Sequence, residues 1–216
     1  AVREVVRRAE RASRMKRVFP SLHRRVARGE RYDVVYADPP WPYYGSGDKW
    51  AAAGKHYGLL SAEDVEAIPV PELLAPRGVA FVWTTSAFLE AAVLLGSAWG
   101  LHYRGVAFVW VKTGADGVPV GAKGVRPSLV KPTTEFVLAF SRVEKGRPMP
   151  LGSEAVPQVW LGRVLAHSQK PEAVALRIES LYPKAKRLEL FARRRRPGWI
   201  CEGNQLPKKT KRTLDT

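Results

Sequence analysis

Four consecutive residues, Asp38, Pro39, Pro40 and Trp41, combine side-chain types that could hold a flat nitrogenous ring. Pro39 fixes its own φ at about −65°, and each proline pushes the residue before it into an extended conformation. Asp38 and Pro39 therefore form a rigid corner, at which the carboxylate and the Pro39 carbonyl accept hydrogen bonds. Two acceptors at one point suit an NH2 group, because they take both hydrogens and free the nitrogen lone pair to attack.

Aromatic side chains follow this corner in the sequence. Trp41 and the nearby Tyr43 and Tyr44 offer faces on which a base could stack, a contact worth about 1–3 kcal/mol per base. A purely structural reading is also open: the prolines only end a strand, and Trp41 belongs to the core. The motif comes directly after the apolar run 32–37 and before an aromatic loop, and this position favours a binding site.

The segments that must position this corner alternate between strand and helix. β-branched and aromatic runs predict strands, and apolar residues three and four positions apart predict helices. The predicted strands are 32–37, 78–85, 102–113, 133–142 and 186–194, the last clear one, and the predicted helices are 2–18, a short one capped by Ser61, 86–99 and 170–183. This alternation predicts an α/β fold with helices on both faces of the sheet. Asp38 and Arg193 lie at the carboxyl ends of predicted strands, where ligands gather in such sheets.

The net charge of +16 is concentrated at the two ends of the chain. Residues 1–31 contain 11 Lys and Arg against 3 Asp and Glu, residues 193–216 contain 8 against 2, and the rest is nearly neutral. Two basic arms on a neutral centre indicate a protein that binds nucleic acid. A surface whose charge only keeps the protein soluble would show the same excess.

Length and composition limit the remaining possibilities. The 216 residues suit one domain, which we expect to span 32–206 between a basic helical arm, 1–31, and a basic tail, 207–216. One cysteine excludes an internal disulfide, and four scattered histidines lack metal-ligand spacing, so no metal is expected. No apolar run reaches the roughly 18 residues that span a membrane, and no signal peptide is visible. These features predict a cytoplasmic protein with no membrane partner.

The motif Asp-Pro-Pro-Trp after an apolar strand resembles the catalytic motif of the adenine-N6 methyltransferases related to the catalytic subunit of the eukaryotic mRNA methyltransferase. The resemblance extends from about Tyr32 to Leu206. It is specific because further matches follow in the family's order: "HYGLLSAEDVEAIPV", "GVAFVWTT", "FVWVKT", "HSQKPE", "ELFARR" and "GNQL". It implies a Rossmann-like fold with a mostly parallel twisted sheet, and S-adenosylmethionine as methyl donor.

The resemblance also implies roles for individual residues. Asp38 and Pro39 would hold the target amine, with Asp38 close to the amino acid part of S-adenosylmethionine. Trp41 would form a wall of the base pocket, and Tyr57 would line the substrate side. The cofactor contacts implied by the family are Lys170 near the methionine end, Arg193 at the ribose, and Asn204 and Gln205 at the ribose or adenine.

Each of these secondary roles competes with a structural one. Lys170 could be only a first-turn helix residue, although a cation there opposes the helix dipole. Tyr57 could serve packing alone. Glu135, an acid inside an apolar strand, could serve the substrate pocket or form a salt bridge with Lys112 or Lys131.

The chain departs from the family after Arg193. Relatives carry a histidine and an asparagine where this sequence has Arg195 and Arg196. One or both arginines could therefore contact nucleic acid in place of cofactor, and we count Arg195 among the substrate-binding candidates.

The sequence thus predicts an enzyme that methylates the 6-amino group of adenine in nucleic acid, with DNA favoured over RNA. Related enzymes that methylate cytosine or protein glutamine typically carry Ser or Asn before the two prolines, so Asp38 favours adenine. The chain could also be a noncatalytic nucleic-acid-binding subunit or a basic structural protein. Target selection would depend on the loops 42–58 and 114–132, the basic arms, a dimer or a partner subunit.

Overall fold

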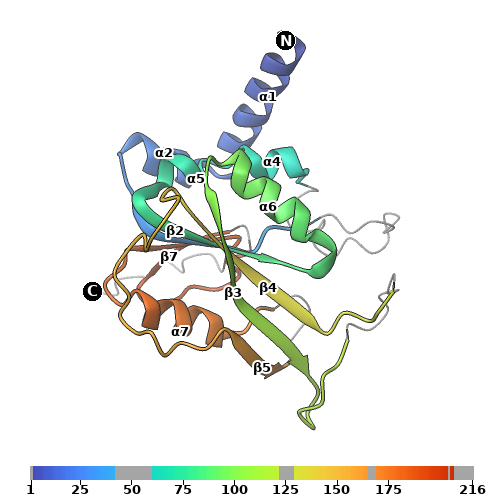
Figure 1. Cartoon of the computed structure of the whole chain (residues 1–216). Helices are drawn as coiled ribbons and strands as arrows, with labels where there is room; N and C mark the ends of the chain where they lie inside the picture. The colour runs from blue at the N-terminus through green and yellow to red at the C-terminus, as the bar shows by residue number, and fades with distance from the viewer. Residues whose placement is uncertain (1, 42–59, 122–128, 165–168, 204, 207–216) are drawn as a thin grey trace, which may run out of the picture.

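A seven-stranded, mostly parallel sheet forms the centre of the computed structural model, which describes residues 2–41, 60–121, 129–164, 169–203 and 205–206 (Figure 1). The strand order is β5-β3-β4-β2-β1-β6-β7. β4 is antiparallel to both of its neighbours, and the other four strand pairs are parallel. The strands are β1 (Tyr32–Ala37), β2 (Leu74–Thr84), β3 (His102–Thr113), β4 (Thr134–Ser141), β5 (Val159–Arg163), β6 (Arg187–Leu190) and β7 (Trp199–Glu202).

Helices cover both faces of the sheet, as predicted (Figure 1). α7 (Glu172–Leu181) packs on one face, where Val174, Ala175 and Ile178 join a core with Tyr36 and Trp83. The other face carries the remaining described helices, and its separate core extends from β1 and β2 to the helices around them. Those helices are α1 (Val2–Val18), α2 (Pro20–Ala27), α4 (Ala62–Glu66), α5 (Val70–Leu73), the 3-10 turn η1 (Ser86–Phe88) and α6 (Leu89–Ala98).

The two faces follow from alternation along the strands. Successive side chains of a strand point to opposite faces, so in β1 Val35 and Ala37 enter one core while Val34 and Tyr36 enter the other. Both faces of β1 are buried from Val34 to Ala37, which explains why these four residues are apolar or aromatic instead of alternating with polar ones.

Most predicted elements are confirmed, and α4 begins as its sequence indicates. The Ser61 hydroxyl accepts a hydrogen bond from the Asp64 N–H, and the Asp64 carboxylate accepts one from the Ser61 N–H. This reciprocal pair is a capping box. α7 is shorter than predicted, because Pro171 is its N-cap and Lys170 therefore precedes the helix.

The prediction of a strand over 186–194 is wrong at its C-terminal end. β6 stops at Leu190 because Phe191 has a φ of 59°, in the left-handed region that bulky residues rarely adopt. The chain turns there, and the Phe191 ring packs edge-on against Phe19 at a centroid distance of 5.7 Å. The prediction that this strand is the last clear one is also wrong, since β7 follows and pairs with it.

Candidate active site

The carboxyl edge of the sheet brings the predicted site residues together. β1, β2, β6 and β7 run in the same direction, so the segments that follow them meet at one edge. Because β4 runs the opposite way, its first residues, including Glu135, lie at this edge as well. Asp38 follows β1 directly, and Lys170 precedes α7.

Four charged side chains form a continuous chain across this edge. Lys170 Nζ lies 3.2 Å from Asp38 Oδ1 and 3.0 Å from Glu135 Oε2. Glu135 Oε1 lies 2.6 Å from Lys112 Nζ. Of the two salt bridges predicted for Glu135, the one to Lys112 is therefore present, and Lys170 adds a second partner.

Aromatic rings lie beside these charges. Lys170 Nζ stands 5.4 Å from the Trp83 ring centroid, and Lys112 Nζ stands 5.4 Å from that of Trp110. The two indoles meet edge to face at 6.4 Å, and Trp83 Nε1 donates to the Tyr36 hydroxyl at 2.6 Å. Since a cation over an aromatic face is attracted to it, the rings help to hold both ammonium groups in place.

The Asp-Pro-Pro-Trp corner is fixed by its own backbone and by Trp41. The Trp41 N–H donates to the Pro39 carbonyl at 2.9 Å, which leaves that oxygen a second lone pair for another donor. Trp41 Nε1 donates to the Trp83 carbonyl at 2.8 Å. The Trp41 ring lies nearly parallel to Phe88, with 6.0 Å between centroids, so one aromatic face is used in packing.

Burial and charge act in opposite directions on the three central side chains. Burial raises the pKa of Asp38, and the ammonium of Lys170 only partly offsets this rise. Burial alone would raise the pKa of Glu135, but Lys170 and Lys112 hold it below its ordinary value. Burial would likewise lower the pKa of Lys170, but the carboxylates of Asp38 and Glu135 raise it, so Lys170 remains a cation.

Arg193 and Gln205 occupy the adjoining part of the same edge. Arg193 is half-buried, and its charge lowers the pKa of Asp38. Gln205 lies in the turn after β7 and is also half-buried. Gly203 brings the two segments together, since a Cβ at this position would overlap the backbone of Ala192.

The run of four arginines is divided between different environments. Arg196 is buried, its Nε lies 3.2 Å from Glu189 Oε2, and its guanidinium also pairs with Glu172. Burial raises the pKa of Glu189 to about 7, although the charge of Arg194 acts against this rise. Arg196 is thus directed at two acids inside the fold, whereas Arg195 is exposed.

Three predicted site residues, Asn204, Tyr43 and Tyr57, lie outside the described residues, as do the loop 42–58 and the central part of the loop 114–132. Across the described ranges, no group of three or more His, Cys, Asp or Glu side chains could hold a metal ion. No helix in the same part of the chain is long and apolar enough to cross a membrane.

The sequence did not predict the cluster of aromatic rings that Tyr36, Trp83 and Trp110 form beside the charged side chains. A signal for it was present, because the similar strings "FVWTT" (81–85) and "FVWVKT" (108–113) place a tryptophan at the same point near the end of two strands. Their common role becomes visible only when β2 and β3 are seen on either side of β4.

Comparisons with known proteins give matches over most of the chain. The model of the MT-A70 family matches residues 32–205. The type II methyltransferase M.MunI of Mycoplasma sp is 35% identical over an aligned length of 208 residues, and the match covers 88% of this chain and 82% of the relative. The N6-methyladenosine RNA methyltransferase MTA1 of Pyricularia oryzae is 28% identical over 191 residues, 81% of this chain and 47% of the relative. The N(6)-adenosine-methyltransferase MT-A70-like protein of Drosophila melanogaster is 31% identical over 180 residues, 82% of this chain and 27% of the relative.

Proposed function

Because the chain belongs to the MT-A70 family of N6-adenine methyltransferases, we propose that it methylates the 6-amino group of adenine in DNA, with S-adenosylmethionine as methyl donor. In this proposal the seven-stranded sheet is a Rossmann-like methyltransferase fold spanning 32–206. The observation that carries the proposal is the position of Asp38, on a rigid corner at the carboxyl end of β1 and 3.2 Å from the Lys170 ammonium.

The corner can bind and polarise an exocyclic amine. The side chain of Asp38 is 24% exposed, so an incoming group can reach its carboxylate, and the Pro39 carbonyl has a second lone pair. S-adenosylmethionine would supply a methyl group bound to a positively charged sulfur. When the amine nitrogen attacks this methyl group, the carbon–sulfur bond breaks and the sulfur leaves as a neutral thioether. The amine proton passes to solvent. Alignment and hydrogen bonding then account for the protein's part in the reaction.

The residues at the carboxyl edge suit a cofactor that carries both charged and polar groups. Asp38 and Lys170 present opposite charges to the two ends of an amino acid, and Arg193 and Gln205 stand beside them with polar side chains. Asn204 would complete this set. The support for these assignments is that Asp38, Arg193 and Gln205 follow strands that end at the same edge of the sheet, with Lys170 beside Asp38.

DNA is the preferred substrate because of how much of each relative the chain covers. M.MunI, named as a type II methyltransferase, is matched over 82% of its length, whereas the N6-methyladenosine RNA methyltransferase MTA1 of Pyricularia oryzae is matched over 47%. Trp41 would wall the base pocket together with Tyr43 and Tyr57, and a duplex substrate would have to turn its adenine out of the stack to reach it.

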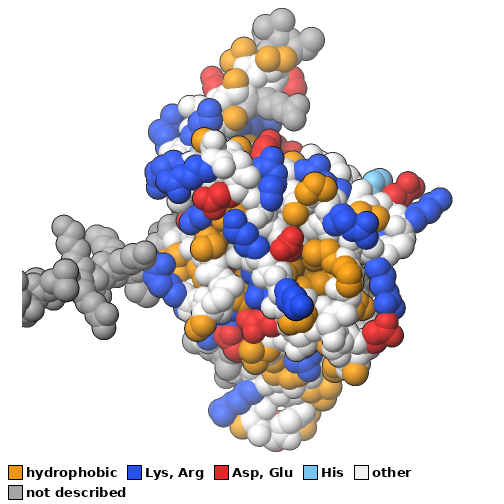
Figure 2. Space-filling view, turned by 90° about the vertical axis from the view of Figure 1, so that its left-hand side faces the viewer, with side chains coloured by type: hydrophobic (Ala, Val, Ile, Leu, Met, Phe, Trp, Pro, Cys, Tyr) orange, Lys and Arg blue, Asp and Glu red, His pale blue; other side chains and the backbone are white. Residues whose placement is uncertain are grey.

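The basic ends of the chain would hold the nucleic acid. Lys and Arg side chains gather around the base of α1 in the space-filling view (Figure 2). Arg195 is exposed beside the candidate site and would add a contact near the target base. Sequence choice would then come from the loops, the arms, or a partner subunit or second copy.

Replacing Asp38 tests the assigned chemistry. Asp38→Asn keeps the shape of the side chain but places an amide where a charged acceptor stood, so we expect methyl transfer to fall by about 100- to 1,000-fold, as for other lost transition-state contacts. Asp33→Asn is the matched control, because Asp33 lies on the same strand but near the opposite edge, where its Oδ2 accepts the Lys186 N–H at 2.8 Å. Transfer at the normal rate by Asp38→Asn would refute the assignment.

The substrate is tested by incubating the protein with labelled S-adenosylmethionine and, separately, duplex DNA, single-stranded DNA and RNA of mixed sequence. Mass spectrometry of the digested products then identifies the methylated nucleoside. We expect N6-methyldeoxyadenosine. N6-methyladenosine from RNA alone would contradict the choice of DNA, and a methylated cytosine would contradict the choice of base.

A further inference from the structure

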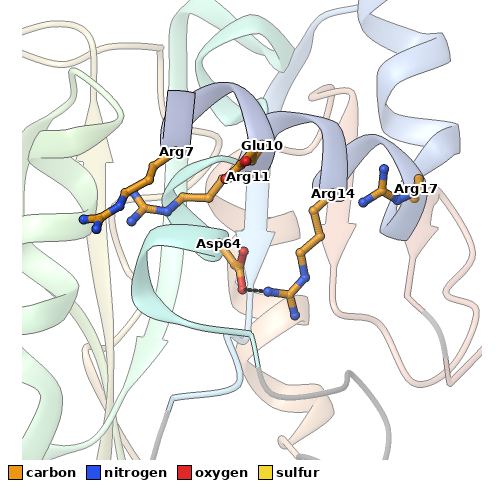
Figure 3. A pocket seen from close by; sticks show the side chains of 6 residues that line it. All are labelled: Arg7, Glu10, Arg11, Arg14, Arg17 and Asp64. Carbon is orange, nitrogen blue, oxygen red and sulfur yellow. Dashed lines mark hydrogen bonds and ion pairs between the residues drawn. The ribbon is translucent and has the colours of Figure 1, made fainter. Parts of the chain in front are cut away.

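We propose that one face of α1 is a docking surface for the phosphate backbone of duplex DNA next to the target adenine, an inference that rests on the proposed function. The surface, here called the arginine stripe, consists of Arg7, Arg11, Arg14 and Arg17. These residues line a groove of 310 Å³ between α1 and α4, together with Glu10 and Asp64 (Figure 3).

The spacing of the stripe places its charges along one side of the helix. Steps of four, three and three residues keep the side chains on one face, because an α-helix has about 3.6 residues per turn. At about 1.5 Å per residue, Arg7 and Arg17 lie roughly 15 Å apart along the axis. Successive phosphates of one DNA strand advance by about 3.4 Å along the duplex, so the stripe spans about four to five of them.

An ion pair fixes the stripe relative to the methyltransferase domain. Arg14 Nη1 lies 2.7 Å from Asp64 Oδ2, and the Asp64 side chain is 2% exposed. The same carboxylate caps α4, so its position is set by a second interaction. α4 is the first described helix after the Asp-Pro-Pro-Trp corner, and the stripe is thus tied to the element that follows the candidate active site in the chain.

The residues of the groove favour phosphates over bases. All six are charged, whereas proteins that bind single strands also use aromatic side chains on which bases stack. Four arginines line the groove with two acids. Asp64 pairs with Arg14 and caps α4, and Arg11 Nη1 lies 3.7 Å from Glu4 Oε1 on the same helix, which still leaves more arginines than carboxylates in the stripe. The remaining positive charge suits a backbone whose bases are stacked inside a duplex.

The test compares two triple variants that each remove three positive charges. Arg7→Ala/Arg11→Ala/Arg17→Ala removes the stripe but keeps the Arg14–Asp64 pair. The control, Lys145→Ala/Lys184→Ala/Lys186→Ala, removes three exposed lysines outside the basic arms. All three lie at the amino edge of the sheet, since Lys145 follows antiparallel β4 and the other two precede parallel β6.

Binding to a duplex containing the methylated sequence is measured by fluorescence anisotropy over a range of salt concentrations. We expect the stripe variant to bind more weakly, on the order of tenfold or more, and its slope of log affinity against log salt to be smaller by about 3, one for each lost phosphate contact. Calorimetry with S-adenosylmethionine should show normal binding, which confirms an intact fold.

Equal losses in the two variants, or an unchanged salt slope in the stripe variant, would overturn the inference. The same titration with single-stranded DNA and duplex RNA separates this result from a failure of the proposed function. If RNA is the methylated substrate and the stripe variant loses affinity only for RNA, both proposals fail. If DNA is methylated and the stripe variant binds it normally, only the docking surface is refuted.

Discussion

At the scale of single residues, the candidate site depends on a balance between burial and charge at Asp38. Burial raises the pKa of its carboxyl group, and Lys170 and Arg193 act against this rise. In the proposed reaction Asp38 accepts hydrogen bonds from the amine as a carboxylate, and the cation beside it favours this ionised form. Lys170 itself remains charged because two carboxylates, those of Asp38 and Glu135, surround it.

This balance predicts a pH effect. Transfer should be lost as the pH falls through the pKa of Asp38, because protonation removes an acceptor. Lys170→Met removes the charge that lowers this pKa, so the acid limb of kcat/KM against pH should move to higher pH. Lys145→Met, at the opposite edge of the sheet, should leave the limb in place. If the acid limb of Lys170→Met is unchanged or moves to lower pH, Lys170 does not lower the pKa of Asp38.

At the scale of elements, the antiparallel direction of β4 determines where Glu135 lies. A parallel strand would carry its first residues to the opposite edge of the sheet, whereas antiparallel β4 brings Glu135 to the edge where β1 and β2 end. There Glu135 joins Lys112 of β3 to Lys170 before α7. The bridge holds three segments in one arrangement around Asp38.

Breaking this bridge should destabilise the fold. Glu135→Gln leaves two largely buried lysines without their shared carboxylate, and we expect the free energy of unfolding to fall by about 3 kcal/mol, as when one partner of a buried ion pair is removed. The control is Glu154→Gln, whose partner Arg147 is exposed, and its cost should stay below about 0.5 kcal/mol. Urea unfolding measures both, and similar values would argue against a structural bridge.

At the scale of the whole molecule, α1 projects from the sheet and its covering helices and is anchored near its C-terminal end (Figure 1). Met15 is fully buried, whereas Val5 is 68% exposed. The predicted helix is therefore confirmed, and among its described side chains the one in the core is Met15, in the second half. The first half is left free to present basic side chains beyond the body of the protein.

The anchor predicts an asymmetric response to truncation of apolar side chains on α1. Met15→Ala leaves a cavity between α1 and the core, and should lower the free energy of unfolding by about 2–5 kcal/mol. Val5→Ala removes an exposed side chain and should change it by less than about 0.5 kcal/mol. Thermal or urea unfolding distinguishes the two, and an equal, small effect would show that α1 is not docked through Met15.

The sequence by itself determined the elements with strong local patterns and the motif at the end of β1. Runs of apolar residues determined β1 and β3, and the Ser61 capping box determined the start of α4. Two prolines fixed the corner at Asp38. Each of these features depends on residues that are close together in the chain. The family resemblance predicted from Tyr32 to Leu206 coincides with the matched range 32–205.

Only the tertiary structure decided which of the distant residues meet. Several partners for Glu135 are compatible with the sequence, and the reversed direction of β4 selected Lys112 and Lys170. β7 escapes prediction because four residues carry too little pattern, and the end of β6 is misplaced because the left-handed turn at Phe191 is not a local preference of phenylalanine. The sequence leaves Arg196 as a candidate for nucleic acid, whereas burial places it between Glu172 and Glu189. In each case long-range packing outweighed local propensity.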